Sequence, residues 1–152
     1  MKKYVALADM FSDKYVGGAE LTTDAILEDK DDEVIRIESN SLTESFIDKH
    51  KDKVWLIFNF SFVDDKLLVK IAKNINYSIV EYDYKFCKHR SPEKCFMIQG
   101  SECSCVDEGI SSKIKKIFYG YSKRIWFMSE IQRQIFLDNV VTIDQEKTKV
   151  LS

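Results

Sequence analysis

Four cysteines, the only ones in the chain, lie within nineteen consecutive positions. They are Cys87, Cys95, Cys103 and Cys105, with the spacing C-x7-C-x7-C-x-C. Thiolates are preferred zinc ligands, and four of them complete a tetrahedral structural site that leaves no position open for a substrate. We therefore predict a structural zinc site, with His89 as a neighbouring loop residue or supporting partner. A long loop with little core of its own is a place where such a metal is useful.

Three other uses of these thiols remain open. Disulfides are disfavoured by a reducing compartment, and ordinary buried or exposed thiols need no partner. A redox switch formed by Cys103 and Cys105 requires thiols of unusual reactivity.

A second group of residues with chemical potential surrounds a glycine pair near the N-terminus. Gly17 and Gly18 follow a short apolar strand, Tyr4–Ala8, and precede a helix expected over Ala19–Asp29. Free N–H groups at a helix N-terminus bind phosphate or carboxylate, and glycine lets a ligand approach the backbone. GGAE is neither GxGxxG nor a P-loop, so a plain helix-entry turn is the alternative. Because Glu20 would repel an anion there, we expect it to accept hydrogen bonds from ligand hydroxyls.

Apolar runs of strand length alternate with segments of helical period along the whole chain. The further strands are expected at Val34–Ile37, Val54–Phe58, Tyr77–Glu81, Ile125–Met128 and Lys149–Leu151. Val54–Phe58 is apolar on both faces, which suits a central parallel strand covered by helices on each side. The order predicts one α/β domain over residues 1–152, with a doubly wound, mostly parallel, Rossmann-like sheet. An irregular insert over residues 83–109 carries the cysteines.

Capping residues and apolar periodicity locate the helices. Ser41 is expected to cap the second helix, Asp64 or Asp65 the third, and Ser129 the last, where Gln132 supports it. Within the insert, Ser91-Pro92-Glu93 predicts the start of a short helix that carries Cys95. Inward-facing residues are expected at Leu21, Ala25 and Ile26, and in the helix before the fifth strand at Ile110, Ile114, Ile117, Phe118 and Tyr121.

Ligands of doubly wound sheets bind beyond the carboxyl ends of the strands. Besides the glycine pair, the candidate donor- or acceptor-binding residues there are Asn59, Ser61, Asp83, Tyr84, Ser129 and Glu130. Glu81 and Asp83 alternate at a strand end, so they point to opposite faces unless the loop turns sharply. Only two histidines exist, and His50 is expected to be solvated, so no Ser-His-Asp arrangement is present. The sequence assigns no catalytic residue.

The charge and hydropathy of the chain exclude some classes of partner. A net charge of −2 offers no basic surplus to neutralise phosphates, so nucleic acid is not expected as a partner. No apolar run has transmembrane length, and no signal peptide is evident. A cytoplasmic location is expected by default, which favours reduced or metal-bound cysteines.

Four phrases resemble glycosyltransferases of family four, which have the GT-B fold. They are GGAELTT after the first strand, NFSFVDDKLL after the third, EYDYKFCKHRSPEKC after the fourth and WFMSEIQRQIF at the fifth. The likeness is closest to a subgroup with a cysteine-bearing insert and covers nearly the whole chain. It corresponds only to the amino-terminal, acceptor-side half of such an enzyme, so we expect the natural chain to continue.

The resemblance implies retaining transfer of a sugar to an acceptor hydroxyl, without a catalytic metal, in a cleft between two Rossmann-like domains. The second domain of such enzymes holds most of the nucleotide-sugar. Gly17, Gly18 and Glu20 match the motif that borders the donor phosphate and the acceptor. Two features of the family have no counterpart: the paired glutamates of the second domain, and a histidine after the fourth strand, near whose place Asp83 or Tyr84 lies.

Two hypotheses follow from these observations. In the first, the chain is the acceptor-side domain of a nucleotide-sugar-dependent glycosyltransferase, inactive until a donor-binding domain of the same or another chain completes the cleft. In the second, it is a stand-alone, zinc-stabilised Rossmann-like binding or interaction module without catalysis.

Overall fold

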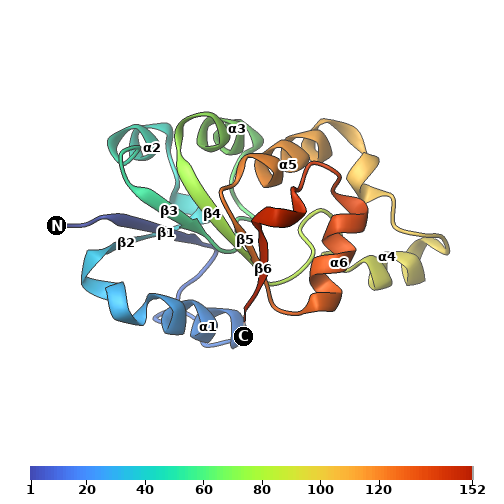
Figure 1. The fold of residues 1–152 in the computed structure, drawn as a ribbon, viewed down its shortest axis with the longest axis horizontal. Helices are drawn as coiled ribbons and strands as arrows, with labels where there is room; N and C mark the ends of the chain where they lie inside the picture. The colour runs from blue at the N-terminus through green and yellow to red at the C-terminus, as the bar shows by residue number, and fades with distance from the viewer. Residues whose placement is uncertain (152) are drawn as a thin grey trace.

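The computed structural model describes residues 1–151 and contains one six-stranded sheet (Figure 1). The strands are β1 (Tyr4–Ala8), β2 (Val34–Glu38), β3 (Val54–Ile57), β4 (Asn76–Glu81), β5 (Ile125–Phe127) and β6 (Thr148–Val150). Their order is β2-β1-β3-β4-β5-β6, and every neighbouring pair is parallel. The predicted α/β class with a parallel, doubly wound sheet is therefore confirmed.

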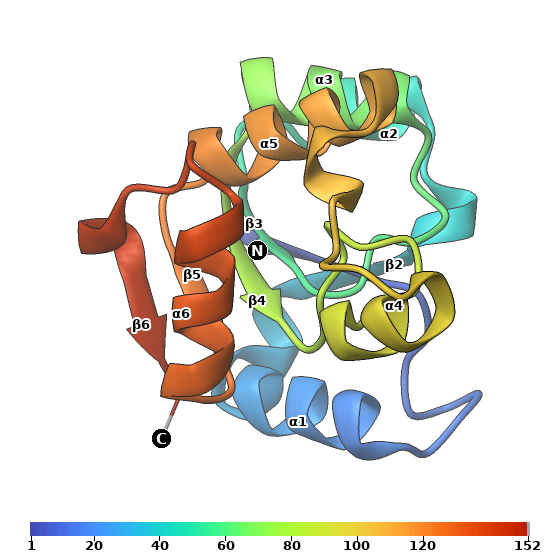
Figure 2. The ribbon, with the colours of Figure 1, turned by 90° about the vertical axis from the view of Figure 1, so that its right-hand side faces the viewer.

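The helices cover both faces of this sheet (Figures 1 and 2). They are α1 (Gly18–Leu27), α2 (Glu44–Lys49), α3 (Asp65–Asn74), α4 (Pro92–Gln99), α5 (Gly109–Tyr121) and α6 (Glu130–Asn139). Four short 3-10 helices also occur: η1 (Glu28–Glu33), η2 (Ser39–Ser41), η3 (Cys105–Asp107) and η4 (Gln145–Lys147). The connection from β1 to β2 runs in the opposite direction from all later ones, so right-handed crossovers place α1 alone on its face.

Alternate residues of β1 divide the core into two layers. Val5 and Leu7 belong to the larger layer, which α2, α3, α5 and α6 cover. Ala6 and Ala8 belong to the smaller layer on the opposite face, where they pack in one cluster with Leu27 of α1. The strand order reverses between β1 and β3, which is where ligands bind in sheets of this kind.

Two helices bury different faces from those predicted. In α1 the buried residues are Thr23 and Leu27, whereas Leu21 is 54% exposed and Ala25 is exposed. Thr23 turns inward because its hydroxyl meets the hydroxyl of Tyr82 at 2.8 Å.

The face of α5 is also rotated from the predicted one. Ile110, Ile117 and Tyr121 are exposed, and Tyr119 is buried instead. Phe118 is buried as predicted, and Ile114 packs against the core. Tyr119 is inward because its hydroxyl reaches a buried carboxylate, and the carbonyl of Phe118 accepts a hydrogen bond from the Tyr77 hydroxyl at 2.5 Å. Apolar periodicity alone cannot show these polar contacts.

Two smaller predictions on the second helix are wrong. Thr43, not Ser41, caps α2, and its side chain accepts a hydrogen bond from the backbone N–H of Phe46 at 3.1 Å. His50 is buried instead of solvated, because its ring packs on Phe46 at a centroid distance of 4.5 Å. Asp64 caps α3, as one of the two predicted candidates.

Candidate functional site

A fully buried carboxylate, Glu81, lies at the carboxyl end of β4. Its exposed fraction is 0%, and its Oε1 atom accepts a hydrogen bond from Lys85 Nζ at 2.5 Å. The other oxygen accepts from the Tyr119 hydroxyl at 2.6 Å. Burial raises the pKa of Glu81, and the Lys85 ammonium opposes that shift. Burial, and then the negative charge of Glu81, raise the pKa of Tyr119 well above its usual value.

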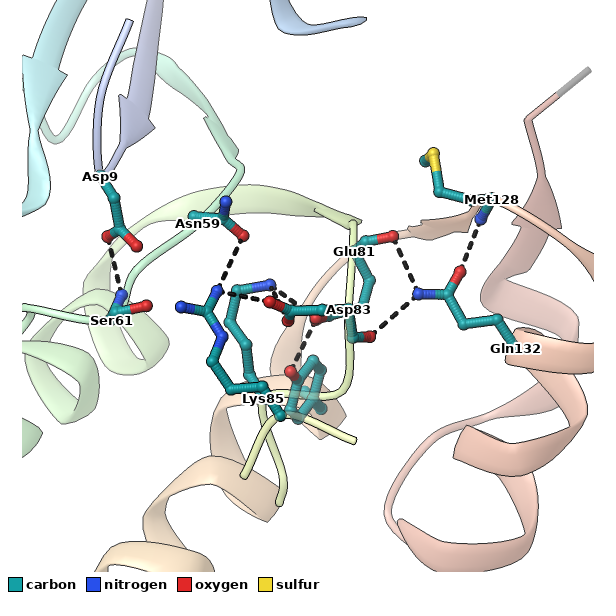
Figure 3. A network of polar contacts seen from close by, with 10 residues as sticks. Asp9, Asn59, Ser61, Glu81, Asp83, Lys85, Met128 and Gln132 are labelled. Carbon is teal, nitrogen blue, oxygen red and sulfur yellow. Dashed lines mark hydrogen bonds and ion pairs between the residues drawn. The ribbon is translucent and has the colours of Figure 1, made fainter. Parts of the chain in front are cut away.

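The loop after β4 bends so that a second carboxylate reaches the same ammonium (Figure 3). Asp83 Oδ1 lies 3.3 Å from Lys85 Nζ, and Asp83 Oδ2 lies 2.5 Å from Arg90 Nη2. Glu81 and Asp83 therefore converge on Lys85, because the sharp turn that separates them overrides the strand alternation. Arg90 also donates to Asn59 Oδ1 at 3.4 Å, which ties the insert to the end of β3.

Gln132 of α6 fixes the path of this loop. Its side-chain amide donates to the carbonyl oxygens of Glu81 and Asp83, at 3.2 and 2.9 Å. Its amide oxygen accepts from the backbone N–H of Met128 at 2.7 Å. Ser129 caps the helix as predicted, by accepting from the N–H of Gln132, so its hydroxyl is already engaged.

Two other candidate residues are also engaged by protein groups. Glu130 is exposed and pairs with Arg133 at 2.8 Å. Tyr84 stacks on Phe136 at 5.8 Å and meets Phe86 edge-on, and burial raises its pKa. Tyr84 therefore contributes packing at this edge of the sheet.

Asp9 joins the ends of three strands. Its Oδ1 atom accepts from the Ser39 hydroxyl at 2.5 Å, after β2, and from the backbone N–H of Ser61 at 2.8 Å, after β3. The candidate Ser61 is thus held by its backbone, and its side chain is exposed. Asp9 directly follows β1, so it marks the carboxyl edge at the point where the strand order reverses.

The glycine turn lies at the N-terminus of α1, as predicted. Gly17 is the N-cap residue, and no side chain caps the helix, so its first N–H groups remain available. A Cβ atom on Gly17 would lie 2.8 Å from both Glu20 Oε2 and the Tyr15 ring, whereas one on Gly18 would meet nothing within 4 Å. Glu20 therefore folds back over the turn, and Gly18 faces open space.

Tyr82 connects the glycine turn with the end of β4. It follows β4 directly, its hydroxyl contacts Thr23 of α1 and its ring stacks on Phe58 at 6.1 Å. Burial raises the pKa of Tyr82 to about 12. The hydrogen bond between Tyr82 and Thr23 opposes this shift, and the negative charge of Glu20 adds to it. The GGAE segment and the β4 loop therefore belong to one edge of the sheet.

A cavity of about 980 Å³ adjoins the loop between β1 and the glycine turn. Its walls include Phe11, Lys14 and Asp24, and Arg36 and Glu38 of β2. Arg36 pairs with Asp24 at 2.9 Å, and Lys14 pairs with Glu38 at 2.5 Å. The lining offers carboxylates and cations that can exchange hydrogen bonds with a hydroxyl-rich ligand.

The four cysteines form one cluster, although they come from separate parts of the insert. Cys87 follows β4, Cys95 lies on α4, Cys103 lies in the next loop and Cys105 begins η3. Their four sulfur atoms all lie within 4.8 Å of one another, and the Cys95 and Cys105 sulfurs are 3.8 Å apart. Zn–S bonds of about 2.3 Å place the corners of a tetrahedron about 3.8 Å apart, so the cluster fits zinc. All four thiols are free.

Local structure around the first cysteine suits a metal ligand. The backbone N–H of His89 points to Cys87 Sγ at 3.4 Å, and no histidine ring belongs to the sulfur cluster among the described residues. Burial raises the pKa of Cys87, but the His89 hydrogen bond helps to bring that pKa below its usual value. Ser91 caps α4 with Pro92 in its first turn, which confirms the predicted short helix that carries Cys95.

The cysteine cluster and the polar edge of the sheet share one turn. The N–H of Arg90 donates to the Cys87 carbonyl at 2.9 Å, and Arg90 has a φ angle of 57°, in the left-handed region. This turn directs Cys87 to the cluster and Arg90 to Asp83. A metal held by the cysteines would therefore fix the position of Arg90.

Several residues at this edge were not predicted from the sequence. They are Asp9, Arg90 and Tyr119; Lys85 was given no role, and Gln132 was expected only as a support for the cap of the last helix. Lys85 had one available signal: a lysine four positions after Glu81 can return to it where the chain turns. Tyr119 and Gln132 belong to distant helices, so no local pattern connects them with Glu81.

Comparison with known proteins adds no functional assignment. No family model matches the chain, and no curated protein matches it. Within residues 1–151, no helix combines the length and the apolar character that crossing a bilayer requires. The functional argument therefore depends on the geometry and on the sequence phrases.

Proposed function

We propose that the chain is the acceptor-side domain of a retaining nucleotide-sugar-dependent glycosyltransferase. The main support is the uncapped N-terminus of α1, where Gly18 faces open space next to the ends of β1 and β4. Backbone N–H groups there can donate to a phosphate or to a sugar oxygen. The four sequence phrases that resemble family four fall at the carboxyl ends of β1, β3, β4 and β5, where such a site is expected.

The roles of individual residues follow from their contacts. Glu20 lies over the turn and can accept hydrogen bonds from hydroxyl groups, while the cavity beside Lys14 and Arg36 offers room for a hydroxyl-rich acceptor. Arg90 contacts both Asp83 and Asn59, so these three residues form a polar group at the carboxyl ends of β3 and β4. The donor would be held mainly by a second domain, because transfer requires that donor and acceptor are positioned by both walls of a cleft.

A calorimetric titration with UDP- and GDP-sugars tests this proposal. We expect weak or undetectable binding to the 152-residue chain, and tight binding once the reading frame is extended past Ser152. In the extended protein, Gly18→Leu should weaken binding, because its side chain fills the space beside the helix N-terminus. Lys30→Leu, at an exposed position shortly after the same helix and outside the cavity lining, is the control and should bind normally. Tight nucleotide-sugar binding by the 152 residues alone would instead favour the stand-alone binding module.

We also propose that the cysteines hold one structural zinc ion. The four thiolates would fill every position of a tetrahedral site, so the metal would order the insert and would not contact substrate. Burial raises the pKa of Cys103, which is the opposite of what a reactive redox thiol requires. The metal's role toward the polar edge would be to hold the turn that carries Arg90.

Elemental analysis of protein purified without chelator tests the metal. We expect about one zinc per chain, as four thiolate ligands complete one tetrahedral site. Cys95→Ser should lower both the zinc content and the melting temperature, while Ser101→Ala, an exposed position of the same insert, should change neither. Protein that is free of metal and melts at the same temperature in both variants would contradict the zinc proposal.

A further inference from the structure

A small cavity separates the cysteine insert from the first turns of α3 and α5. Its volume is about 260 Å³. Four cationic side chains line it, Lys85, Lys88, Arg90 and Lys115, and Asp65 is the one carboxylate. The formal charge of the lining is therefore four positive minus one negative, or +3, on a chain whose net charge is −2.

Two of the hydrogen-bonding groups on these cations lack a strong protein partner. The ammonium group of Lys115, which lies in α5, makes no ion pair or hydrogen bond with any residue from 1 to 151. The Nε atom of Arg90 is buried, and no described residue accepts its hydrogen bond. Lys88 is exposed and lies 3.9 Å from Glu108, a loose pair. Lys85 is enclosed by strong contacts through Glu81, and the terminal nitrogen Nη2 of Arg90 pairs with Asp83.

The backbone and the hydroxyl groups around the cavity are also donors. Asp65 is the first residue of α3 and Ser111 is the third of α5, so both helices begin at the cavity wall. Each helix carries a partial positive charge at this end. The Ser111 hydroxyl donates to Asp65 at 3.2 Å, which satisfies the only carboxylate of the lining. No side chain caps α5, so its first N–H groups remain available.

We propose that this cavity binds a small oxyanion, the phosphate or carboxylate group of a larger ligand. The Lys115 ammonium, the Arg90 guanidinium and the uncapped N-terminus of α5 converge on a space of the right size, and charge-assisted hydrogen bonds to such groups are strong. The binding does not depend on the function proposed above. One consequence does depend on the proposed function: if the chain is the acceptor-side domain of a glycosyltransferase, its acceptor carries an acidic group.

The same cations have one competing role, which is to balance the charge of a metal site. Zinc with four thiolates carries a net charge of −2, and Cys87 forms part of the cavity wall. Charge balance alone does not require an open cavity. It also does not require a hydroxyl-bearing residue such as Ser61 on the cavity wall. Cys87 is also the only cysteine on the lining, so most of the metal charge would lie behind the wall.

Titrations of the zinc-loaded protein with small anions, followed by amide NMR, test the proposal. The probes are inorganic phosphate, glucose 6-phosphate and glucuronate, with glucose as the neutral control. We expect saturable shifts at the first turns of α3 and α5 with one or more of the anions and none with glucose. Tighter binding of the two phosphate probes identifies a phosphate ligand, and tighter binding of glucuronate identifies a carboxylate.

Two variants of α5 separate a specific site from general attraction. Lys115→Gln should weaken anion binding about tenfold, the effect of one lost charge-assisted hydrogen bond. Lys113→Gln, exposed on the same helix and outside the cavity, should leave it unchanged. Equal losses in both variants, or no saturation at about 20 mM anion, a limit that excludes even weak sites, would overturn the proposal. So would a Lys115→Gln protein that binds anion normally but has lost zinc.

Discussion

Replacing Lys85 by methionine tests whether the buried pair at the end of β4 stabilises the fold. Among residues 1–151, the change removes the only cation that contacts the fully buried carboxylate of Glu81, and leaves it a single hydrogen bond, from Tyr119. Breaking a buried ion pair from one side costs about 3–5 kcal/mol, because the other charge stays buried without compensation. We expect a loss of that size in the free energy of unfolding at neutral pH.

The dependence of this loss on pH identifies its cause. Burial raises the pKa of Glu81 from 4.5, and without Lys85 nothing cationic opposes that shift. A carboxyl group whose pKa is raised in the folded state does not destabilise the fold below the pKa that it has in the unfolded chain. Above that pKa it lowers the free energy of unfolding increasingly as the pH rises. Each pH unit between the pKa of Glu81 in the native protein and its higher pKa in the variant therefore adds up to about 1.4 kcal/mol to the loss caused by Lys85→Met. The deficit should be larger at neutral than at mildly acidic pH.

Urea denaturation of a small set of variants measures these effects. Lys88→Met, three positions along and exposed, should cost less than about 0.5 kcal/mol. A double variant with Glu81→Gln added to Lys85→Met should be more stable than Lys85→Met alone, because no buried charge remains. The reasoning is refuted if the Lys85→Met loss stays below about 1 kcal/mol, or does not change with pH.

Two further predictions concern the core. Burial lowers the pKa of His50 in the folded protein, so between pH 6.5 and that lowered pKa the unfolded chain binds more protons than the folded one. The free energy of unfolding should therefore fall as the pH drops through this window. In urea titrations, His50→Gln should make this fall smaller. An unchanged slope in His50→Gln would contradict this. Gly120→Ala should destabilise by about 1 kcal/mol in thermal melts, because its Cβ would lie 3.0 Å from Thr142 Cβ and 3.2 Å from its carbonyl oxygen. Gly18→Ala, which meets nothing, should be neutral or slightly stabilising, and equal effects at both glycines would contradict the packing argument.

The parallel sheet was predictable because it depends on local and repeated signals. Each strand is a short apolar run, and helical segments separate the strands, so the order alone determines the class. The cysteine cluster was also predictable as a group, because its members are close in sequence. The predicted faces of α1 and α5 were wrong where a hydroxyl, that of Thr23 or Tyr119, bonds to a distant polar atom. Apolar periodicity contains no information about such pairs.

The candidate site shows the same limit more strongly. The sequence located the glycine turn, Asn59 and Asp83, since each follows a strand. It gave no role to Lys85 or Arg90, which lie inside an irregular loop and return to the sheet only through the turn after β4. Their positions depend on tertiary contacts that no spacing rule describes.

The pairing of Glu81 with Lys85 has a consequence for how the insert relates to the rest of the fold. The last residue of a sheet strand and the loop that follows it are chemically matched, since the loop supplies the ammonium that a buried carboxylate needs. The loop therefore cannot be removed without leaving the carboxylate of Glu81 buried and unpaired. Any shortened version of this domain that joins β4 directly to α5 would require an uncharged residue in place of Glu81, and the two changes would have to be made together.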